Sequence, residues 1–310
     1  MATIVISEFM DEESVRALTA RTDVLYNPAL VDQPALLLAE LANCRALIVR
    51  NRTQVRGDLL KAAPHLEVVG RLGVGLDNID VEACKTLGII VHPATGANDD
   101  AVAEYVVCAA LSLLRRAFMR SGDVAAGVWP RESMIGHEIS GRQAGMVGFG
   151  GTARKAAARL AALGMKIAAY DPLLPDDHEA WRSAKRMSLN ALLAESDVVS
   201  LHVPLTPATH HMIDMAALAL MRKEAVLINA ARGGIVDESA LVASLRSGLL
   251  GGAALDVFEH EPLNASHGQL FNGIRNLILT PHIAGVTVES NVRVSRKIAD
   301  LVLTALKLGS

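Results

Sequence analysis

The stretch QAGMVGFGGTARKAAARLAALGMKIAAYD, residues 143–171, decides the expected fold of this chain. A short apolar run leads into Gly148-x-Gly150-x-x-Ala153, an Ala/Leu-rich segment of helical length follows, and a second apolar run ends at Asp171. This order of strand, glycine-rich turn, helix and strand is typical of the dinucleotide-binding βαβ unit. The segment therefore predicts an α/β fold with a doubly wound parallel sheet of the Rossmann type.

The glycine-rich turn has the residues that a pyrophosphate site needs. Gly148 permits the tight turn, Gly150 lets the backbone approach a pyrophosphate, and the small Ala153 allows the helix to pack closely on the strand. The helix that follows directs amide donors and the positive end of its dipole towards the turn. We therefore expect Gly148 and Gly150 to bind a nucleotide cofactor, with a plain structural turn as the alternative for the glycine pattern taken alone.

Asp171 distinguishes between the nicotinamide cofactors. It ends the second apolar run, roughly 20 residues after the glycine motif, where this fold places a carboxylate on the ribose hydroxyls. A carboxylate there repels a 2′-phosphate, and Pro172 and Leu173 follow it in place of an arginine. The sequence favours NAD over NADP, although Asp171 could instead cap a turn.

Two series of alternating apolar runs and helical segments lie on either side of residues 99–120. This intervening segment has helical spacing throughout and is expected to bridge two domains. The tail, residues 288–308, reads as one further amphipathic helix. A chain of 310 residues exceeds the size at which one core usually keeps growing, so two domains are expected.

Composition excludes several function classes. The formal net charge is −3 and no dense Lys/Arg cluster is present, which disfavours nucleic acid and an anionic membrane as partners. No apolar run reaches the roughly 20 residues of a membrane span, and the N-terminus lacks the basic region of a signal peptide. The three cysteines are isolated, so neither a metal site nor a disulfide framework is expected. A small-molecule partner and a cytoplasmic location remain.

Three segments place a polar residue directly after an apolar run: Arg232 in NAARGGIVDE, Glu261 in DVFEHEP and His282 in LTPHIAG. The carboxyl ends of parallel strands meet at the ligand crevice of an open sheet, so these residues are expected to converge. Imidazole suits a base that takes a hydroxyl proton while hydride leaves the same carbon, and a carboxylate on its other nitrogen fixes the tautomer. The planar, permanent charge of arginine suits a substrate carboxylate. Taken singly, each residue has an ordinary alternative as a surface charge, a turn residue or a core imidazole.

These residues lie in segments through which the chain resembles the D-isomer-specific 2-hydroxyacid dehydrogenases. The matching segments are VGRLGVGLDNID (69–80), NDDAVAEY (98–105), VGFGGTA (147–153), SDVVSLHVPLTPATHHMI (196–213), LINAARGGIVDE (227–238), GAALDVFEHEPL (252–263) and NLILTPHIAG (276–285). The resemblance implies hydride transfer between NAD and C2 of a small D-2-hydroxy acid, with Arg232, Glu261 and His282 as the catalytic set. Two departures, Ala153 for the third glycine and Ala101 where many relatives have serine, remove no catalytic group.

The resemblance also implies binding residues and a domain arrangement. The residues expected to line NAD are Gly148, Gly150, Gly151, Thr152, Asp171, Val203, Ala230, Ala231, Arg232, Asp256, His282 and Gly285, with Asp256 near the nicotinamide carboxamide. Substrate contacts are expected from Arg50, Asn51, Val74, Gly75 and Asn98. Residues 1–96 with 286–310 would form a flavodoxin-like substrate domain, and residues 97–285 the NAD-binding domain. A homodimer formed through the NAD-binding domain is implied as well.

The substrate class is narrowed by further arginines. Within the family, the chain is most similar to the branches that act on 3-phosphoglycerate or 3-sulfolactate, whose substrates carry a second anion at C3. Arg50, Arg52 and Arg71 supply more positive charge than one carboxylate requires, which is compatible with a dianionic acid. Hydroxypyruvate or glyoxylate reduction is the alternative within the family. An NAD-sensing, corepressor-like binding protein and a Rossmann-type methyltransferase are the alternatives from other classes.

Overall fold

The computed structural model describes residues 2–308, which form two compact units. One unit contains the residues up to Asn98 together with those from Val286 onward, and the other contains Asp99–Gly285. We call them the first and the second unit. None of the helices in residues 2–308 combines the length and the apolar character needed to cross a bilayer.

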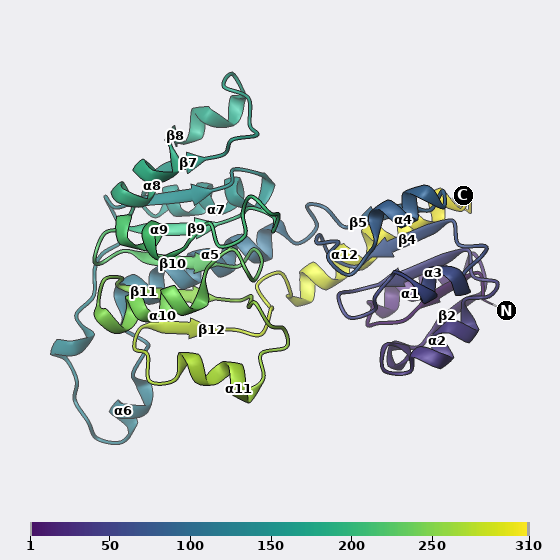
Figure 1. Cartoon of the computed structure of the whole chain (residues 1–310), viewed down its shortest axis with the longest axis horizontal. Helices are drawn as coiled ribbons and strands as arrows, with labels where there is room; N and C mark the ends of the chain where they lie inside the picture. The colour runs from purple at the N-terminus through teal and green to yellow at the C-terminus, as the bar shows by residue number, and fades with distance from the viewer. Residues whose placement is uncertain (1, 309–310) are drawn as a thin grey trace. The chain divides into compact units, whose positions relative to one another are not determined.

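The second unit is built on a seven-stranded, fully parallel sheet with the order β12-β11-β10-β9-β6-β7-β8 (Figure 1). Its strands are β6 (Gln143–Val147), β7 (Lys166–Tyr170), β8 (Lys185–Arg186), β9 (Val198–Leu201), β10 (Val226–Asn229), β11 (Gly252–Leu255) and β12 (Leu277–Leu279). The strand order reverses between β6 and β9, which places the ligand crevice of a Rossmann sheet at their carboxyl ends. The predicted fold class is confirmed.

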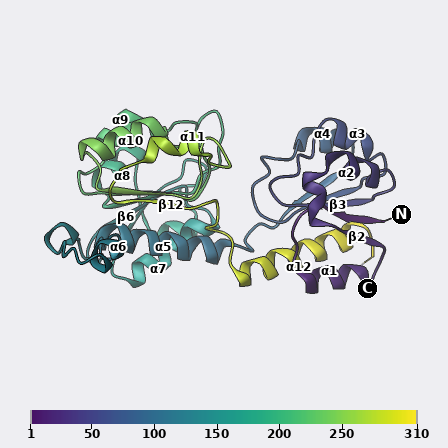
Figure 2. The same cartoon turned by 90° about the horizontal axis from the view of Figure 1, so that it is seen from below.

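Helices cover both faces of this sheet, as Figure 2 shows. They are α5 (Asp99–Arg115), α7 (Gly151–Ala162), α8 (Leu189–Glu195), α9 (Met215–Leu220), α10 (Glu238–Ser247) and α11 (Ala265–Gly268), with short 3₁₀ turns η3 (Glu179–Ser183) and η4 (Gln269–Phe271). The unit also contains α6 (Ser121–Ala125) and the 3₁₀ turn η2 (Glu132–Met134), none of whose residues is buried. One core packs α5 and α7 against the sheet, and a second packs α8, α9 and α10 against its other face. Since both faces are covered, β9, β10 and β11 are buried throughout, which explains their largely apolar sequences.

The first unit contains a five-stranded parallel sheet with the order β2-β1-β3-β4-β5, the flavodoxin-like arrangement. Its elements are β1 (Ile4–Ile6), α1 (Glu12–Thr19), β2 (Val24–Tyr26), η1 (Pro28–Asp32), α2 (Pro34–Glu40), β3 (Ala46–Val49), α3 (Asp58–Ala62), β4 (Val68–Arg71), α4 (Val81–Thr86), β5 (Ile90–Pro93) and α12 (Val288–Ala305). Helices α1 and α12 cover one face, and α2, α3 and α4 cover the other. Helix α12 begins at a capping box in which Thr287 and Ser290 exchange hydrogen bonds.

The helix expected over residues 99–120 is shorter and placed differently than the sequence predicts. Helix α5 ends at Arg115 because Arg116 adopts a positive φ of 55°, a conformation that a right-handed helix does not contain. Helix α5 packs on α7 and belongs wholly to the second unit, so it does not bridge the units. The two-residue strand β8 is also absent from the sequence prediction, since two residues carry no periodicity.

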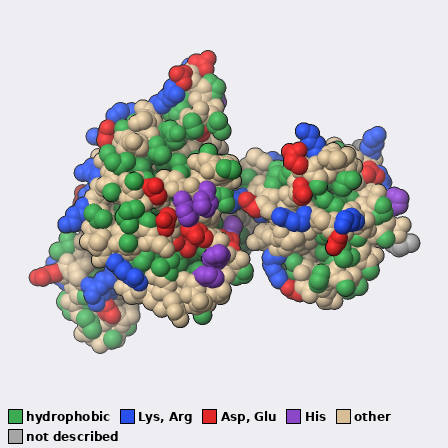
Figure 3. Space-filling model, viewed as in Figure 1, with side chains coloured by type: hydrophobic (Ala, Val, Ile, Leu, Met, Phe, Trp, Pro, Cys, Tyr) green, Lys and Arg blue, Asp and Glu red, His purple; other side chains and the backbone are tan. Residues whose placement is uncertain are grey.

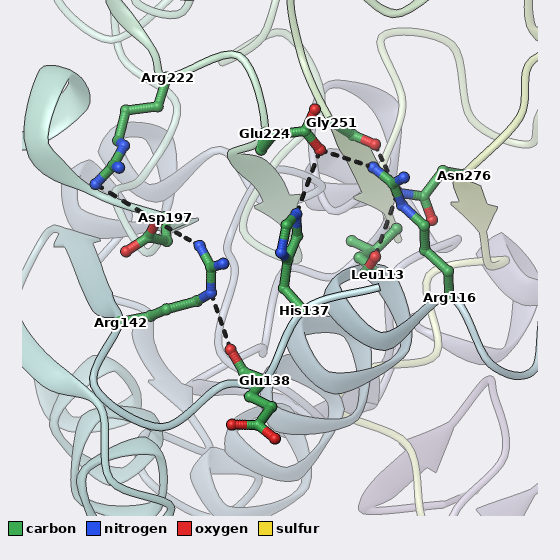
Figure 4. A network of polar contacts seen from close by, with 10 residues as sticks. All are labelled: Leu113, Arg116, His137, Glu138, Arg142, Asp197, Arg222, Glu224, Gly251 and Asn276. Carbon is green, nitrogen blue, oxygen red and sulfur yellow. Dashed lines mark hydrogen bonds and ion pairs between the residues drawn. The ribbon is translucent and has the colours of Figure 1, made fainter. Parts of the chain in front are cut away.

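Residues 117–136, which we call the arm, extend from the second unit and include α6 (Figure 1). Contacts with a single carboxylate hold both of its ends, because a carboxylate oxygen of Glu224 lies 3.1 Å from the guanidinium of Arg116 and 3.5 Å from Nε2 of His137 (Figure 4). Beside them, Arg142 donates to the mostly buried carboxylate of Asp197 at 2.8 Å. The arm therefore starts and ends at a fixed position near the amino ends of the central strands.

Candidate active site

The turn between β6 and α7 has the shape that a pyrophosphate site requires. Gly148 has a φ of 86°, and a Cβ atom there would lie 2.9 Å from the carbonyl oxygen of His202. Gly150 is the N-cap of α7, and a Cβ atom there would meet no other atom within 4 Å, so its outer side is open. Ala153 is fully buried against the sheet, as its size predicts. The turn thus fits a pyrophosphate bound to the amides of the helix N-terminus.

Asp171 follows β7 and lies beside this turn. Its carboxylate accepts hydrogen bonds from the amide of Phe149 at 2.8 Å and from the amide of Leu173 at 2.9 Å. The same residue lines a cavity of about 550 Å³ together with Tyr170, Pro172, Arg186, Met187 and Ser188. Asp171 therefore both supports the glycine turn and offers carboxylate oxygens to a ligand in the cavity, which suits the ribose of the cofactor.

Asp171→Ala is expected to weaken NAD binding about tenfold and to narrow the difference in affinity between NAD and NADP. The variant loses the ribose acceptor and the support of the Phe149 amide, and it also removes the charge that repels a 2′-phosphate. Isothermal titration with each cofactor measures both effects. An unchanged ratio of the two dissociation constants would show that the ribose lies elsewhere.

The other residues expected at the cofactor follow the carboxyl ends of the strands, with one unforeseen contact. Gly151 and Thr152 begin α7, Val203 follows β9, Ala230 and Ala231 follow β10, Asp256 follows β11, and Gly285 comes after β12. The hydroxyl of Thr152 donates to Asp99 at 2.7 Å, so a carboxylate of α5 lies against the start of α7. The sequence does not predict this contact, because the two residues are far apart in the chain.

His282 and Glu261 form the central pair of the candidate site. Nδ1 of His282 lies 2.7 Å from a carboxylate oxygen of Glu261, and both side chains remain partly exposed. With a carboxylate at Nδ1, that nitrogen carries the proton and Nε2 is left to accept one. Burial raises the pKa of Glu261, but hydrogen bonds from His282 and from the Phe258 amide outweigh it, and the pKa lies below its usual value. The partner of the histidine is therefore an anion at neutral pH.

The backbone around His282 is held by Asp256. His282 has a positive φ of 53°, which is uncommon for a residue other than glycine. Its amide donates to the Asp256 carbonyl, while the buried Asp256 carboxylate accepts from the amides of Ile283 and Ala284 at 2.8 Å each. The Thr280 hydroxyl completes this set at 2.6 Å. Asp256 thus fixes the loop that presents the imidazole, a role beyond the one that the resemblance implies.

Arg232 comes close to this pair through its neighbouring glycine. A Cβ atom on Gly233 would lie 1.8 Å from the carbonyl oxygen of Phe258, so only glycine lets the loop after β10 pass the loop that carries Glu261. The charge of Arg232 contributes to the lowered pKa of Glu261. Asn229 supports the turn by donating to the Arg232 carbonyl at 2.9 Å. The structure therefore brings together the three residues predicted to be catalytic.

A second histidine at a strand end, His202, has a different environment. It follows β9, and its Nε2 lies 2.9 Å from the hydroxyl of Ser200. Burial lowers the pKa of His202 to about 4, so this imidazole is neutral at physiological pH. No carboxylate is its partner among residues 2–308, and His282 is the better candidate for acid–base chemistry.

Histidine and acidic side chains also gather on one face of the second unit (Figure 3). His211 contacts Glu259 at 3.0 Å, and the rings of His260 and His267 stack with centroids 4.3 Å apart. Within the described part of the chain, no three His, Cys, Asp or Glu side chains are arranged to hold a metal ion. This face therefore offers no candidate metal centre.

The residues predicted to contact substrate lie in the first unit. Arg50 and Asn51 follow β3, Val74 and Gly75 follow β4, and Asn98 ends the first segment of the unit. Buried Glu8 organises the loop of Arg50, since its carboxylate accepts the amides of Arg50, Arg52 and Thr53 at 2.9, 3.2 and 3.0 Å. Glu8 is not among the residues predicted from the sequence, although an acidic residue just after the first apolar run is a visible signal.

The three arginines proposed for a dianionic acid differ in their surroundings. The guanidinium of Arg50 contacts two neutral side chains, those of Phe9 and of Asn291, the latter at 3.1 Å. Burial lowers the pKa of Arg50, and the charge of Glu8 opposes that shift. Arg52 forms an exposed ion pair with Asp32. Arg71 lies beneath the next loop, where a Cβ atom on Gly73 would come within 1.4 Å of its guanidinium. Arg50 is therefore the best placed of the three to receive an anion.

Comparison with known proteins agrees with the fold and with the family that the sequence resembles. Residues 107–284 match the model of the D-isomer specific 2-hydroxyacid dehydrogenase family, NAD binding domain. An (S)-sulfolactate dehydrogenase of Chromohalobacter salexigens is 53% identical over 307 residues, 99% of each chain. A D-3-phosphoglycerate dehydrogenase of Mycobacterium leprae is 37% identical over 99% of this chain and 57% of its own length. The crystal structure of a D-lactate dehydrogenase from Aquifex aeolicus with NAD and lactic acid superposes with a TM-score of 0.84 at 27% identity, covering 98% of this chain and 95% of that one.

Proposed function

The chain belongs to the D-isomer specific 2-hydroxyacid dehydrogenases, and we propose that within this family it oxidises (S)-3-sulfolactate to the corresponding 2-oxo acid. The enzyme transfers a hydride between C2 of a small D-2-hydroxy acid and NAD. The main structural support for this reaction is the 2.7 Å hydrogen bond between His282 and Glu261 beside Arg232. The similarity to a sulfolactate dehydrogenase over the full length of both chains supports the substrate.

Proton transfer is the task of His282. Bound NAD supplies the acceptor for the hydride that leaves C2. Nε2 of His282 takes the proton of the C2 hydroxyl, and the anionic Glu261 stabilises the imidazolium that results. In the reductive direction the same nitrogen returns the proton to the carbonyl oxygen. Arg232 binds the C1 carboxylate with its two-pronged guanidinium and so orients C2.

Arg50 is the proposed ligand for the anion at C3. Among residues 2–308 its guanidinium forms no ion pair, and its partners Asn291 and Phe9 are neutral. A partly desolvated cation whose guanidinium is not held in an ion pair suits a substrate anion. Glu8 and Asn78 hold the loop that presents it, the latter by donating to the carbonyl oxygens of Arg50 and Thr53.

Initial rates with NAD on (S)-3-sulfolactate, its R enantiomer, 3-phosphoglycerate, D-glycerate and D-lactate test this proposal. We expect kcat/KM for (S)-3-sulfolactate to exceed that for D-lactate at least about tenfold, because one charge-assisted contact contributes about 1.5–3 kcal/mol. Arg50→Gln is expected to narrow this difference. A higher kcat/KM for 3-phosphoglycerate, the second candidate, would reassign the anion to phosphate. Turnover on none of these acids would favour an NAD-sensing binding protein.

We further propose that the enzyme is a cytoplasmic homodimer whose interface includes the arm. The arm exposes large apolar side chains, among them Trp129 (79% exposed), Phe118 (74%) and Ile135 (70%). Clustered apolar and aromatic side chains of this size are typical of protein interfaces. The three cysteines are free thiols, which supports a reducing compartment.

Trp129→Ser is expected to shift the protein from dimer to monomer at micromolar concentration, since a buried tryptophan contributes strongly to an interface. Size-exclusion chromatography with light scattering measures the change. Leu173→Ser is the matched control, because Leu173 is 89% exposed in the same unit but lies outside the arm. A dimer that persists in Trp129→Ser combined with Phe118→Ser would place the interface elsewhere.

A further inference from the structure

A cationic side chain, Arg186, lines the same cavity as Asp171. It lies on the edge strand β8, where it pairs in parallel register with Ala169 of β7. The adenosine of NAD carries no negative charge at its ribose hydroxyls, so an arginine beside the ribose carboxylate is not needed for NAD. A guanidinium is instead the group that best recognises a phosphate.

We propose that Arg186 is a second determinant of cofactor choice. Its guanidinium can bind the 2′-phosphate of NADP in this cavity, but the carboxylates of Asp171 and Asp176 prevent that binding in the wild type. Asp171 opposes the phosphate directly, because its negative charge occupies the ribose site. Asp176 acts on Arg186, with which it forms an ion pair at 2.5 Å. The proposal concerns cofactor binding alone and does not depend on the identity of the hydroxy acid.

The position of Arg186 is defined by aromatic stacking. Its guanidinium lies over the ring of Trp181, 5.4 Å from the centroid, and Trp181 in turn stacks on Phe149 at 5.8 Å with an interplanar angle of 16°. Phe149 is fully buried within the glycine-rich turn, and its amide donates to Asp171. Arg186 is therefore connected by packed rings to the turn that holds the pyrophosphate, so its place in the cavity is built into the cofactor site.

The ion pair with Asp176 is of a kind that a ligand can displace. The side chains of Arg186 and Asp176 are 47% and 82% exposed, so solvent screens their attraction. A phosphate monoester carries about 1.5 to 2 negative charges and three acceptor oxygens, which a single exposed carboxylate does not match. Once the charge of Asp171 is removed, Arg186 is expected to exchange Asp176 for the 2′-phosphate.

Direct binding of adenosine fragments tests this role without any turnover. Isothermal titration with NAD, NADP, 5′-AMP and 2′,5′-ADP is carried out on the wild type, on Asp171→Ala, and on Asp171→Ala combined with Asp176→Asn or Arg186→Gln. Relative to Asp171→Ala alone, we expect the added Asp176→Asn change to tighten 2′,5′-ADP binding about threefold, and the added Arg186→Gln change to weaken it at least about tenfold. Binding of NAD and 5′-AMP is expected to change less than about twofold when Arg186 is replaced.

Two further variants separate a specific contact from a general charge effect. Lys185→Gln removes a cation from the adjacent residue of β8, which pairs with Glu195 and does not line the cavity, and it should leave 2′,5′-ADP binding within about twofold. Arg186→Lys should retain part of the affinity. Equal losses for NAD and NADP in Arg186→Gln would assign the guanidinium to adenine and overturn the proposal. Unchanged binding of every ligand would overturn it as well, and thermal unfolding of each variant identifies a folding defect.

Discussion

Replacing His282 by glutamine is expected to lower kcat by about 10³-fold while the dissociation constant of NAD stays within about twofold of the wild-type value. Glutamine occupies a similar volume and can still accept from the substrate hydroxyl, but it does not take up a proton. The hydride then leaves C2 without the concerted loss of the hydroxyl proton. Steady-state rates with the best hydroxy acid, together with titration of NAD, measure the two quantities separately.

Glu261→Gln sharpens this test because it removes the charge while the amide oxygen can still accept from His282, although the amide of Phe258 then loses its acceptor. We expect a smaller loss in kcat, of about 10²-fold, since the imidazolium loses its counter-ion but the base remains. His65→Gln, an exposed histidine of the first unit, is the matched control and should leave kcat unchanged. Wild-type kcat in His282→Gln would rule out proton transfer by this residue, and His202 would then be the next histidine to replace.

The sequence was sufficient to predict the sheet of the second unit and the convergence of Arg232, Glu261 and His282, for a definite physical reason. Each of Arg232, Glu261 and His282 lies in the loop that follows a buried or partly buried strand, and the carboxyl ends of parallel strands necessarily share one edge of the sheet. The βαβ pattern also predicts the sheet itself, because strands buried on both faces have distinctive apolar runs. Fold class and convergence of the site thus follow from local patterns.

Other features depended on contacts that local patterns do not contain. Glu8 accepts from the amides of Arg50, Arg52 and Thr53, more than 40 positions away, and its place after the first apolar run does not identify these partners. The contact between Thr152 and Asp99 likewise joins residues that are far apart in the chain. So does the contact of the Tyr105 hydroxyl with Thr280 at 2.7 Å, and burial raises the pKa of Tyr105 to about 12. The end of α5 at Arg115 was missed because a positive φ at an arginine has no sequence signature.

Arg232→Lys is expected to lower kcat/KM by at least about 10²-fold, most of it through KM, although the positive charge is retained. A lysine ammonium is a point charge that cannot form two parallel hydrogen bonds to a carboxylate, so C2 loses its alignment with the base. Part of the loss should appear in kcat, because misplacement of the reacting carbon slows the chemical step. The change also leaves Glu261 beside a cation, which keeps that carboxylate anionic.

Arg246→Lys is the control for this substitution, since Arg246 donates to the Leu270 carbonyl on an exposed surface of the same unit. The kinetic constants of Arg246→Lys should match those of the wild type. The unfolding temperature of Arg232→Lys should also match the wild-type value, which shows that this variant is folded. A KM for the hydroxy acid that is unchanged in Arg232→Lys would mean that the carboxylate is bound by another group, and Arg50 would be the first candidate. In that case Arg50→Gln would abolish turnover of D-lactate as well as reduce the preference for an acid with a C3 anion. Comparing one dianionic and one monoanionic acid therefore assigns each arginine to one of the two anions of the substrate.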